Sequence, residues 1–358
     1  MKKIAFVMPV LGMGGAERVV STIIRYIDKE EFDSYLLLFK GEGDYEKTLP
    51  KNIRIIVLGQ NTLAKNCYKL IKELRLIKPD IVFSSMRSVS AILGLFSFTL
   101  PTNTKLVFRE NNTPSVSIAE SRFPLIWQII YKTIFRKAST IVCQSDYMLE
   151  DFKSTFGFTG ENLIKIYNPI DLELINKQIH QKSSPFPKSE FKNVVAIGKM
   201  TNQKGFDLLI QSLAESREKD SKIKLWVLGE GKELDNYKRL ARILEIEDDV
   251  HFVGRQCNPF LWMKHADLFI LSSRYEGLPN VLLEALACGC KVVTTDHPGG
   301  TREIMEIINC ADRIVSLNWS SDWFKPMPIN RMKFEDTFHV SKVIKQYEHL
   351  FNNLMQSE

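Results

Sequence analysis

The sequence predicts an α/β protein built from two doubly wound domains, each with a parallel sheet between layers of helices. Three observations carry this prediction. The chain has 358 residues, which is long enough for two domains with their own cores. Apolar runs of strand length alternate with longer helical runs through most of the chain. A strand, a glycine loop and a helix follow one another twice, near residue 10 and near residue 198, as expected if each domain opens with that unit.

Strands and helices are expected to alternate through both halves of the chain. In the first half, strands are predicted at 4–10, 35–39, 81–84, 105–108 and 140–143, and helices at 63–76, 89–98, 125–137 and 147–156, with another that ends near residue 27. Residues 183–188 contain two prolines and are interpreted as a linker. In the second half, strands are predicted at 193–197, 224–228, 250–254, 268–271 and 291–295, with helices at 208–214, 279–286 and 340–354.

The composition is that of an ordinary globular chain, with 44% hydrophobic and 25% charged residues. No apolar run reaches the roughly 18 residues that span a bilayer, and the basic start of the chain leads into a strand without a signal cleavage site, so a cytoplasmic location is expected. The six cysteines are scattered, without the spacing of a metal site, and are interpreted as reduced thiols. No metal and no cofactor are expected.

Positive charge is concentrated in the first half. Residues 61–140 contain twelve Lys or Arg against four acidic residues, a net charge of +8 within a chain whose total is +6. Within this stretch, residues 124–137 form an apolar helix with aromatic and basic side chains at its edge. Two interpretations stay open: a core helix that covers the sheet, or a helix that lies on an anionic membrane surface. Nucleic acid is not an expected partner, since no groove-reading or base-stacking motif accompanies the charge.

The stretch from Ser272 to Gly289 has the strongest indication of a ligand site. A buried strand ends before it, Pro279 fits the first turn of a helix, and Gly289 suits its left-handed end. A helix that begins at the carboxyl end of a parallel strand directs unpaired N–H groups toward the crevice where α/β sheets bind ligands, and it favours anions. Glu276 and Glu284 flank these donors. They are expected to accept hydrogen bonds from hydroxyl groups on either side of a phosphate, an order that fits sugar, diphosphate and ribose.

The glycine loop near residue 10 provides a second place for close backbone approach. Gly14 and Gly15 allow N–H groups to come near a phosphate or a sugar. The loop does not match a dinucleotide fingerprint, because Glu17 stands where that pattern has its third glycine. A nicotinamide cofactor is therefore not expected, and a tight turn without a ligand is the alternative.

In these motifs the sequence resembles the retaining glycosyltransferases of family 4, whose mark is a Glu, seven residues and a second Glu. The resemblance covers most of residues 1–308 and implies two Rossmann-like domains facing across a cleft, the GT-B arrangement. It implies domains at 1–175, for the acceptor, and at 176–338, for the nucleotide sugar, with a terminal helix at 339–358 that packs back toward the first domain.

The resemblance also assigns roles to single residues. Glu276 and the backbone of Gly277, Leu278, Pro279 and Asn280 would hold the donor sugar, and Glu284 the ribose. Gly198 lies in the turn whose flanking cations, Lys199 and Lys204, would hold the diphosphate. Gly254 and Arg255 would lie near the base, and Gly14 and Gly15 would face the cleft. The residues expected to take part in these contacts are Glu276, Lys204, Lys199, Asn111, Gly14, Gly15, Gly198, Gly254, Arg255, Gly277, Leu278, Pro279, Asn280 and Glu284.

Two positions depart from the family pattern. Lys199 replaces the usual Arg, and it neutralises a phosphate without the bidentate fork of a guanidinium. Asn111 stands where many relatives have a histidine near the transferred sugar, and an amide can bond a hydroxyl but cannot titrate.

The resemblance implies a retaining hexosyltransferase that moves a sugar, expected from a UDP-sugar, to a glycan or polyprenyl-diphosphate-linked acceptor in cell-envelope polysaccharide synthesis. No Asp-x-Asp motif is present, so the lysines and the helix N-terminus are expected to balance the diphosphate without a metal. Two other functions stay open, a non-catalytic subunit that binds a nucleotide sugar and a nucleotide-sugar epimerase on the same fold.

Overall fold

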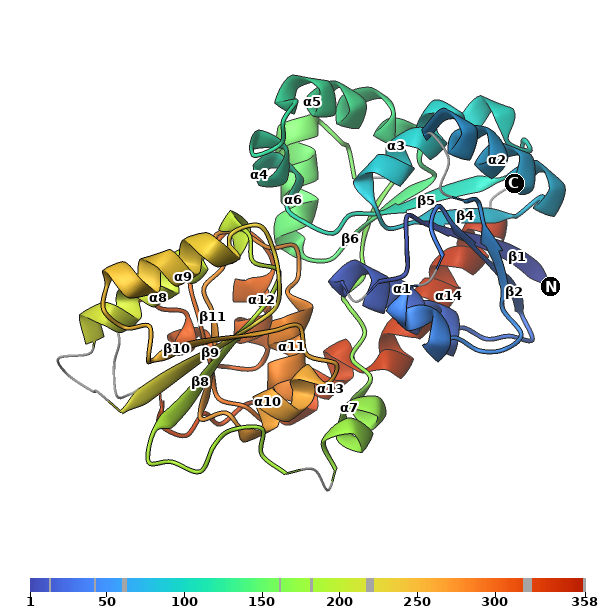
Figure 1. Cartoon of the computed structure of the whole chain (residues 1–358). Coiled ribbons are helices and arrows are strands. Elements are labelled where there is room, and N and C mark those ends of the chain that lie inside the picture. Colours follow the sequence, from blue (N-terminus) through green and yellow to red (C-terminus); the bar gives the residue numbers. More distant parts are fainter. Residues whose placement is uncertain are drawn as a thin grey trace. The chain divides into compact units, whose positions relative to one another are not determined.

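The computed structural model divides the chain into two compact units (Figure 1). The first unit comprises Met1–Pro169 and Thr337–Glu358, and the second comprises Ile170–Asp336. The structure describes the chain except for residues 13, 42, 60–62, 161, 181–182, 217–221, 318–323 and 357–358, and the side chains of 63 and 64. Each unit is described by itself.

The first unit is built on a seven-stranded sheet in which every neighbouring pair is parallel. Its strands are β1 (Lys2–Met8), β2 (Phe32–Leu38), β3 (Arg54–Val57), β4 (Ile81–Ser84), β5 (Lys105–Arg109), β6 (Thr140–Cys143) and β7 (Leu163–Lys165). The spatial order is β3-β2-β1-β4-β5-β6-β7. The winding direction therefore reverses between β1 and β4, the place where open α/β sheets form a crevice at the carboxyl ends of their strands.

Helices cover both faces of this sheet (Figure 1). They are α1 (Gly15–Tyr26), α2 (Leu63–Ile77), α3 (Arg87–Leu95), α4 (Pro114–Ala119), α5 (Pro124–Thr133), α6 (Asp146–Phe156) and α14 (Val340–Gln356). Side chains alternate along β1, so Ala5 and Val7 pack against α2, α3, α5 and α6, while Phe6 and Met8 pack against α1 and α14.

Helix α14 belongs to the core of the first unit although it comes from the end of the chain. Tyr347 and Phe351 are fully buried, and both rings pack against Phe83 of β4, with centroids about 6 Å apart (6.0 and 6.1 Å). Burial of an apolar face of this kind is what holds a helix to a sheet. The terminal helix is therefore an integral part of the first unit.

The second unit is built on a five-stranded parallel sheet with the order β10-β9-β8-β11-β12. Its strands are β8 (Lys192–Ile197), β9 (Ile223–Leu228), β10 (Val250–Gly254), β11 (Leu268–Leu271) and β12 (Val292–Thr294). Its helices are α7 (Leu172–Ile179), α8 (Phe206–Ser216), α9 (Leu234–Ile243), α10 (Pro259–His265), α11 (Asn280–Ala287), α12 (Thr301–Ile307) and α13 (Arg331–Phe338), the last of which crosses the division between the units. Here the winding reverses between β8 and β11.

The two-domain α/β prediction is confirmed, but the boundaries differ from the expected residues 175 and 338. The second unit begins at Ile170, because α7 packs against α10 and α11. The predicted linker is also anchored in the second unit. Phe186 is buried there, with its ring 5.1 Å from that of Trp262 and 5.5 Å from that of Trp226. The interpretation of residues 183–188 as a linker was therefore wrong at Phe186, which supplies apolar area that the second core covers.

All six cysteines are free thiols. Burial is the largest influence on Cys290 and raises the pKa of its thiol to about 12, so it stays protonated and unreactive at neutral pH. No helix among the described residues combines the length and the apolar character that crossing a bilayer requires.

Candidate functional site

Four loops meet at the carboxyl edge of the second sheet, around the reversal between β8 and β11. They follow β8 (residues 198–205), β9 (229–231), β11 (272–279) and β12 (295–300). Because the strands are parallel, all four loops leave from the same edge. This edge brings together the residues that the sequence placed in three separate motifs.

Two glycines allow these loops to lie backbone against backbone. Gly229 has a φ of +137°, and a Cβ at this position would collide with the carbonyl oxygen of Gly198. Gly299 has a φ of +130°, and a Cβ there would collide with the carbonyl of Glu276. Only glycine suits such positions, since L residues avoid both the dihedral and the contact. The loop after β12 therefore lies directly on the loop that carries Glu276.

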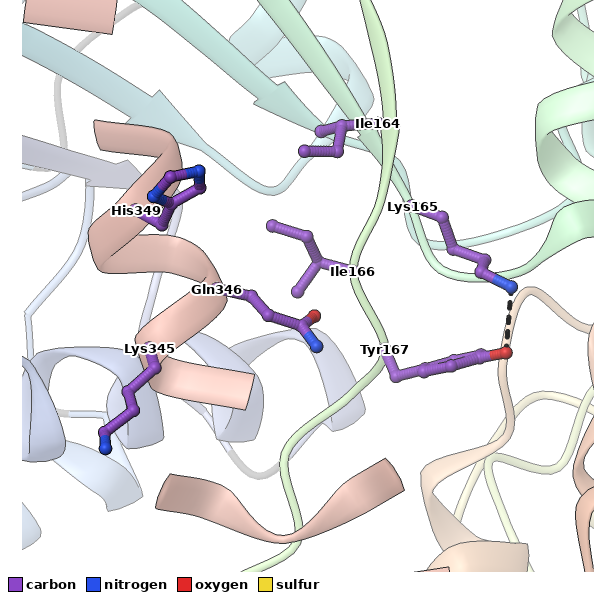
Figure 2. Close-up of a pocket in the computed structure, with 7 residues that line it drawn as sticks. All are labelled: Ile164, Lys165, Ile166, Tyr167, Lys345, Gln346 and His349. Carbon is purple, nitrogen blue, oxygen red and sulfur yellow. Dashed lines mark hydrogen bonds between the residues drawn. The ribbon is translucent and has the colours of Figure 1, made fainter. Parts of the chain in front are cut away.

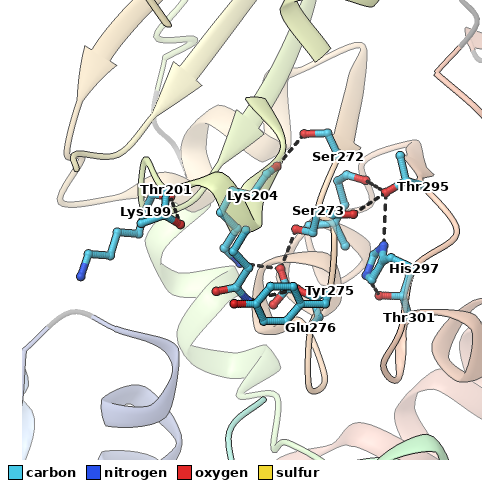
Figure 3. Close-up of polar contacts among 12 residues, drawn as sticks. Lys199, Thr201, Lys204, Ser272, Ser273, Tyr275, Glu276, Thr295, His297 and Thr301 are labelled. Atoms are coloured by element: carbon cyan, nitrogen blue, oxygen red, sulfur yellow. Dashed lines mark hydrogen bonds and ion pairs between the residues drawn. The ribbon is translucent and has the colours of Figure 1, made fainter. Parts of the chain in front are cut away.

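Lys204 and Glu276 form an ion pair at the centre of this edge (Figure 3). Lys204 Nζ lies 2.6 Å from Glu276 Oε1, and the two side chains are 18% and 7% exposed. The hydroxyl of Ser273 donates a second hydrogen bond of 2.6 Å to the same carboxylate oxygen. The aliphatic stem of Lys204 crosses Gly198, where a Cβ would lie only 3.2 Å from the stem carbons. Glu276 is thus held in one orientation by two neighbouring loops.

Helix α11 begins directly after this carboxylate. Pro279 occupies the N-cap position with an extended backbone, and Asn280 is the first helical residue, so the helix begins one residue later than predicted. The carbonyl of Gly277 accepts a 2.6 Å hydrogen bond from the N–H of Gly300, and Leu278 is buried. Glu284 lies in the second turn and is only 5% exposed. Both predicted acids are therefore buried side chains rather than solvated surface acids.

The two predicted phosphate-binding lysines differ in their surroundings. Lys204 is largely buried beside Glu276, whereas Lys199 is exposed and its side chain extends away from Glu276 (Figure 3). A long lysine stem is flexible, so its ammonium group can serve a ligand at the rim of the site. The structure brings only Lys204 into contact with the carboxylate.

Gly254 and Arg255 lie at the end of the neighbouring strand, β10. The carbonyl of Gly254 accepts a 2.9 Å hydrogen bond from the N–H of Gly229, which ties the end of β10 to the loop after β9. Gly254 has a φ of +69°, and the space where a Cβ would point is open within 4 Å. Arg255 is exposed.

A set of polar residues behind Glu276 was not predicted from the sequence. His297 is 8% exposed, and its ring nitrogens contact the hydroxyls of Thr295 and Thr301 (Figure 3). Burial is the largest influence on His297 and lowers the pKa of its imidazole. A lone histidine in a loop has no spacing pattern. The one available signal was its place beside Gly299 and Gly300, between a strand and a helix.

The remaining predicted residues lie in the first unit, at the carboxyl edge of its sheet. Gly14 and Gly15 follow β1 and are exposed, with Gly14 as the N-cap of α1. Asn111 follows β5, two strands away in the sheet.

The amide of Asn111 is already engaged within the first unit. Its Oδ1 accepts hydrogen bonds from the Arg109 guanidinium and from Ser85 Oγ, the latter at 3.0 Å. Its Nδ2 donates to the carbonyl of Ser85. These bonds give Asn111 a structural role at the end of β5, and a ligand hydroxyl would compete with partners that are already present.

Two buried ionisable residues precede Asn111. Arg109 is 2% exposed and also donates to Asn168. Glu110 is 5% exposed and accepts a hydrogen bond from the hydroxyl of Tyr131, while burial raises the pKa of its carboxyl. Because Glu110 is buried directly after β5 and bonded to Tyr131, it supports the fold of this loop.

A pocket of about 380 Å³ lies elsewhere in the first unit, between β7 and α14 (Figure 2). Its lining consists of Ile164, Lys165, Ile166, Tyr167, Lys345, Gln346 and His349. None of the predicted site residues is among them. The described residues also contain no group of three His, Cys, Asp or Glu side chains placed to hold a metal ion.

Comparisons with known proteins assign the chain to a family. The model of the glycosyl transferases group 1 matches residues 176–307, and the model of Glycosyltransferase Family 4 matches residues 13–174. The N-acetylgalactosamine-N,N'-diacetylbacillosaminyl-diphospho-undecaprenol 4-alpha-N-acetylgalactosaminyltransferase of Campylobacter jejuni is 31% identical over 316 residues, which are 85% of this chain and 83% of that protein. The chain belongs to the family 4 glycosyltransferases. The O-antigen biosynthesis glycosyltransferase WclY of Escherichia coli is 24% identical over 99% of both chains.

Solved structures show that this glycosyltransferase has the GT-B fold. The Anabaena protein Alr3699/HepE in complex with UDP-glucose superposes with a TM-score of 0.75 at 19% identity, over 99% of this chain and all of that chain. At this identity the likeness concerns the fold. The family models and the polysaccharide-related relatives show a glycosyltransferase, and the ion pair of Lys204 and Glu276 lies within the part matched by the group 1 model.

Proposed function

We propose that the chain is a retaining glycosyltransferase that moves a sugar from a nucleotide-diphosphate donor, a UDP-sugar, to a glycan or polyprenyl-diphosphate-linked acceptor in cell-envelope polysaccharide synthesis. The observation that carries the proposal is the buried pair of Lys204 and Glu276, next to the first turn of α11 at the reversal of the second sheet. The names of the Campylobacter transferase, which acts on a diphospho-undecaprenol, and of the Anabaena complex with UDP-glucose support the acceptor and donor classes.

In this proposal the donor extends along the carboxyl edge of the second sheet. Glu276 accepts hydrogen bonds from the sugar hydroxyls, and Glu284 accepts them from the ribose. The diphosphate lies between them, at the N–H groups of the first turn of α11. Lys204 has three donor hydrogens, so it can hold Glu276 and a phosphate oxygen together. Lys199 reaches the diphosphate from the rim, and Gly254 and Arg255 lie near the base.

The proposed chemistry uses one face of the sugar. The bond from the anomeric carbon to the phosphate oxygen breaks, and the acceptor oxygen forms its bond on the same side. The acceptor proton passes to the departing phosphate oxygen, so no separate base is needed. The charge that grows on the diphosphate is balanced by Lys204, Lys199 and the α11 amides, in a preorganised site where such groups act strongly. We propose that no metal ion takes part.

A transfer assay tests this function. Purified protein is incubated with labelled nucleotide sugars and membrane lipid extract, with and without chelator. We expect label in the lipid fraction in both cases, and retention of the anomeric configuration by NMR. A changed sugar without transfer would identify an epimerase. If neither is observed, the chain is a binding subunit. Loss of transfer in the presence of chelator would overturn only the proposal that no metal ion takes part.

Two substitutions connect the assay with the site. We expect Glu284→Ala to weaken nucleotide binding, and Glu276→Ala mainly to lower kcat, because Glu276 faces the transferred sugar in this proposal. Calorimetric binding of UDP and steady-state rates separate the two effects. Wild-type behaviour of both variants would exclude the assigned donor site.

We further propose that the protein works at the cytoplasmic face of the membrane and binds anionic lipid through α5. Its side chains Leu125, Ile126 and Ile129 are each more than half exposed, as is Phe123 just before the helix. The chain has no acidic residue from 121 to 145. An exposed apolar stripe with basic neighbours suits the interface of an anionic bilayer.

A further inference from the structure

His297 is a buried side chain between Thr295 and Thr301, in the same part of the second unit as Glu276 (Figure 3). Its Nδ1 lies 3.2 Å from Thr295 Oγ1, and its Nε2 lies 2.8 Å from Thr301 Oγ1. Thr295 comes directly after β12, and Thr301 is the first residue of α12. The imidazole therefore joins the end of a strand to the start of the next helix.

The hydroxyl of Thr295 determines which nitrogen carries the proton. Its only hydrogen goes to a backbone carbonyl, that of Ser273 at 2.8 Å in preference to that of Leu271 at 3.4 Å, so toward His297 it can only accept. Nδ1 is then the protonated nitrogen, and Nε2 accepts from the hydroxyl of Thr301. The arrangement is a directed chain from Thr301 through His297 and Thr295 to the Ser273 carbonyl.

This chain of hydrogen bonds ends at Ser273, the residue that also holds the Glu276 carboxylate. Ser273 accepts from Thr295 through its carbonyl and donates from its hydroxyl to Glu276 Oε1 at 2.6 Å. The backbone supports the same link, since the N–H of Glu276 donates to the carbonyl of Pro298 at 3.0 Å. His297 is thus connected to Glu276 through both the side chains and the loop that follows β12.

We propose that neutral His297, with its proton on Nδ1, is a positioning residue that fixes Ser273 and thereby aims the Glu276 carboxylate at the donor sugar. The proposal rests on the proposed role of Glu276. His297 itself touches no substrate in it. Protonation would turn Nε2 into a donor, so the hydroxyl of Thr301 could no longer donate to it, while Nδ1 would still donate to Thr295.

Some charged groups around the His297 ring raise its pKa, and others lower it. Glu276 and Asp296 favour the protonated imidazole and Lys204 opposes it, while Arg302 pairs with Asp296 at 2.5 Å. Burial exceeds these influences and lowers the pKa of His297 from the ordinary value of 6.5. The imidazole is therefore neutral at neutral pH, and it becomes protonated in the folded protein only at a pH below 6.5.

Four variants test the proposal by their effect on transfer. His297→Leu and Thr295→Val break the chain that reaches Ser273, and we expect kcat to fall by about tenfold to a hundredfold while the KM for the donor changes little. Thr301→Val removes only the hydrogen bond between Thr301 and Nε2 of His297. It is the matched control, and we expect a smaller loss of kcat. His297→Asn keeps a donor toward Thr295 and should recover most of the rate. An unchanged kcat in His297→Leu, or equal losses in the two threonine variants, would overturn the proposal.

The pH profile and a crystal structure give readouts that a general structural role would not move. Protonation leaves the Nδ1–H donor toward Thr295 in place, so we expect kcat of the wild type to fall at a pH below 6.5 by no more than it does in Thr301→Val, and this small acid limb to be absent in His297→Asn. In crystals of His297→Leu, the Glu276 carboxylate should leave Ser273 Oγ. If it stays within hydrogen-bond distance, the proposal fails. The crystal result does not depend on turnover, so an inactive wild type would refute the proposed function and leave this test valid.

Discussion

The ion pair of Lys204 and Glu276 leads to a prediction about the stability of single-residue variants. Replacing Lys204 with Met removes the cation from a buried carboxylate that keeps the neutral donor Ser273. Loss of one partner from a fully buried pair typically costs ~3–5 kcal/mol. Because Lys204 is 18% exposed and water can reach its place, we expect a smaller loss of about 2 kcal/mol in the free energy of unfolding.

The double variant Lys204→Met with Glu276→Gln separates stability from function. The neutral amide removes the unpaired charge, so we expect urea unfolding to show a recovered stability relative to Lys204→Met alone. We expect no sugar transfer by the double variant, because it lacks both the positive charge toward the diphosphate and the carboxylate toward the sugar. Recovery of transfer together with stability would show that the pair has only a structural role.

The sequence predicted these two residues because each belongs to a motif, a glycine turn with cations in one case and two acids around a helix start in the other. It could not predict that they touch each other, since residues 204 and 276 come together only when β8 and β11 become neighbours in the sheet. The direction of the Lys199 side chain could not be predicted from the sequence either. Asn111 was found by alignment with a family position, yet its hydrogen bonds to Ser85 and Arg109 depend on packing that a sequence does not show.

At the scale of elements, α5 makes the prediction that concerns membranes. The basic residues in and beside α5 are not equivalent, because Arg136, just after the helix, donates to the carbonyls of Phe156 and Gly157 at 3.0 and 2.7 Å and so supports the fold. The informative variant is therefore Arg122→Gln with Lys132→Gln and Lys137→Gln, whose residues are exposed. Each basic residue near an anionic surface contributes about 1 kcal/mol, so binding to phosphatidylserine vesicles should fall by roughly a hundredfold.

A charge-matched control distinguishes this helix from a general effect of net charge. Lys238→Gln, Lys264→Gln and Lys342→Gln remove three exposed charges from other helices, and this variant should sediment with vesicles like the wild type. A second variant, Leu125→Ser with Ile129→Ser, should also weaken binding through the apolar stripe. Equal retention of all proteins would show that α5 does not contact lipid.

Elements with a continuous buried apolar run were predicted well, and exposed elements were not. Strand β4 was predicted with its observed bounds, because all four of its residues are buried. Strand β3 lies at the sheet edge with exposed side chains, so its pattern is weak. Helix α7 was missed because its eight residues precede a proline-rich segment that was interpreted as linker. Competition between local composition and tertiary packing explains these errors.

At the scale of the whole molecule, two separate cores predict two unfolding transitions. Each unit has its own sheet and buried clusters, and the first is completed by α14. If the donor binds at the carboxyl edge of the second sheet, UDP should raise the melting temperature of the second unit by mass action. A substitution in α14 should instead act on the first unit. Calorimetry can therefore assign each transition.

Phe351→Ala provides the substitution in α14, because its ring is fully buried against Phe32, Phe83 and Tyr347. Loss of a buried phenyl ring costs about 3–5 kcal/mol, and in a unit of this size each kcal/mol lowers the melting temperature by roughly 2–4 °C. We expect one calorimetric transition to fall by that amount and the UDP-sensitive transition to stay in place. Lys342→Ala, at an exposed position of the same helix, should move neither. If Phe351→Ala shifts both transitions equally, the two cores unfold as one cooperative unit, and the terminal helix stabilises the donor site as well as its own sheet.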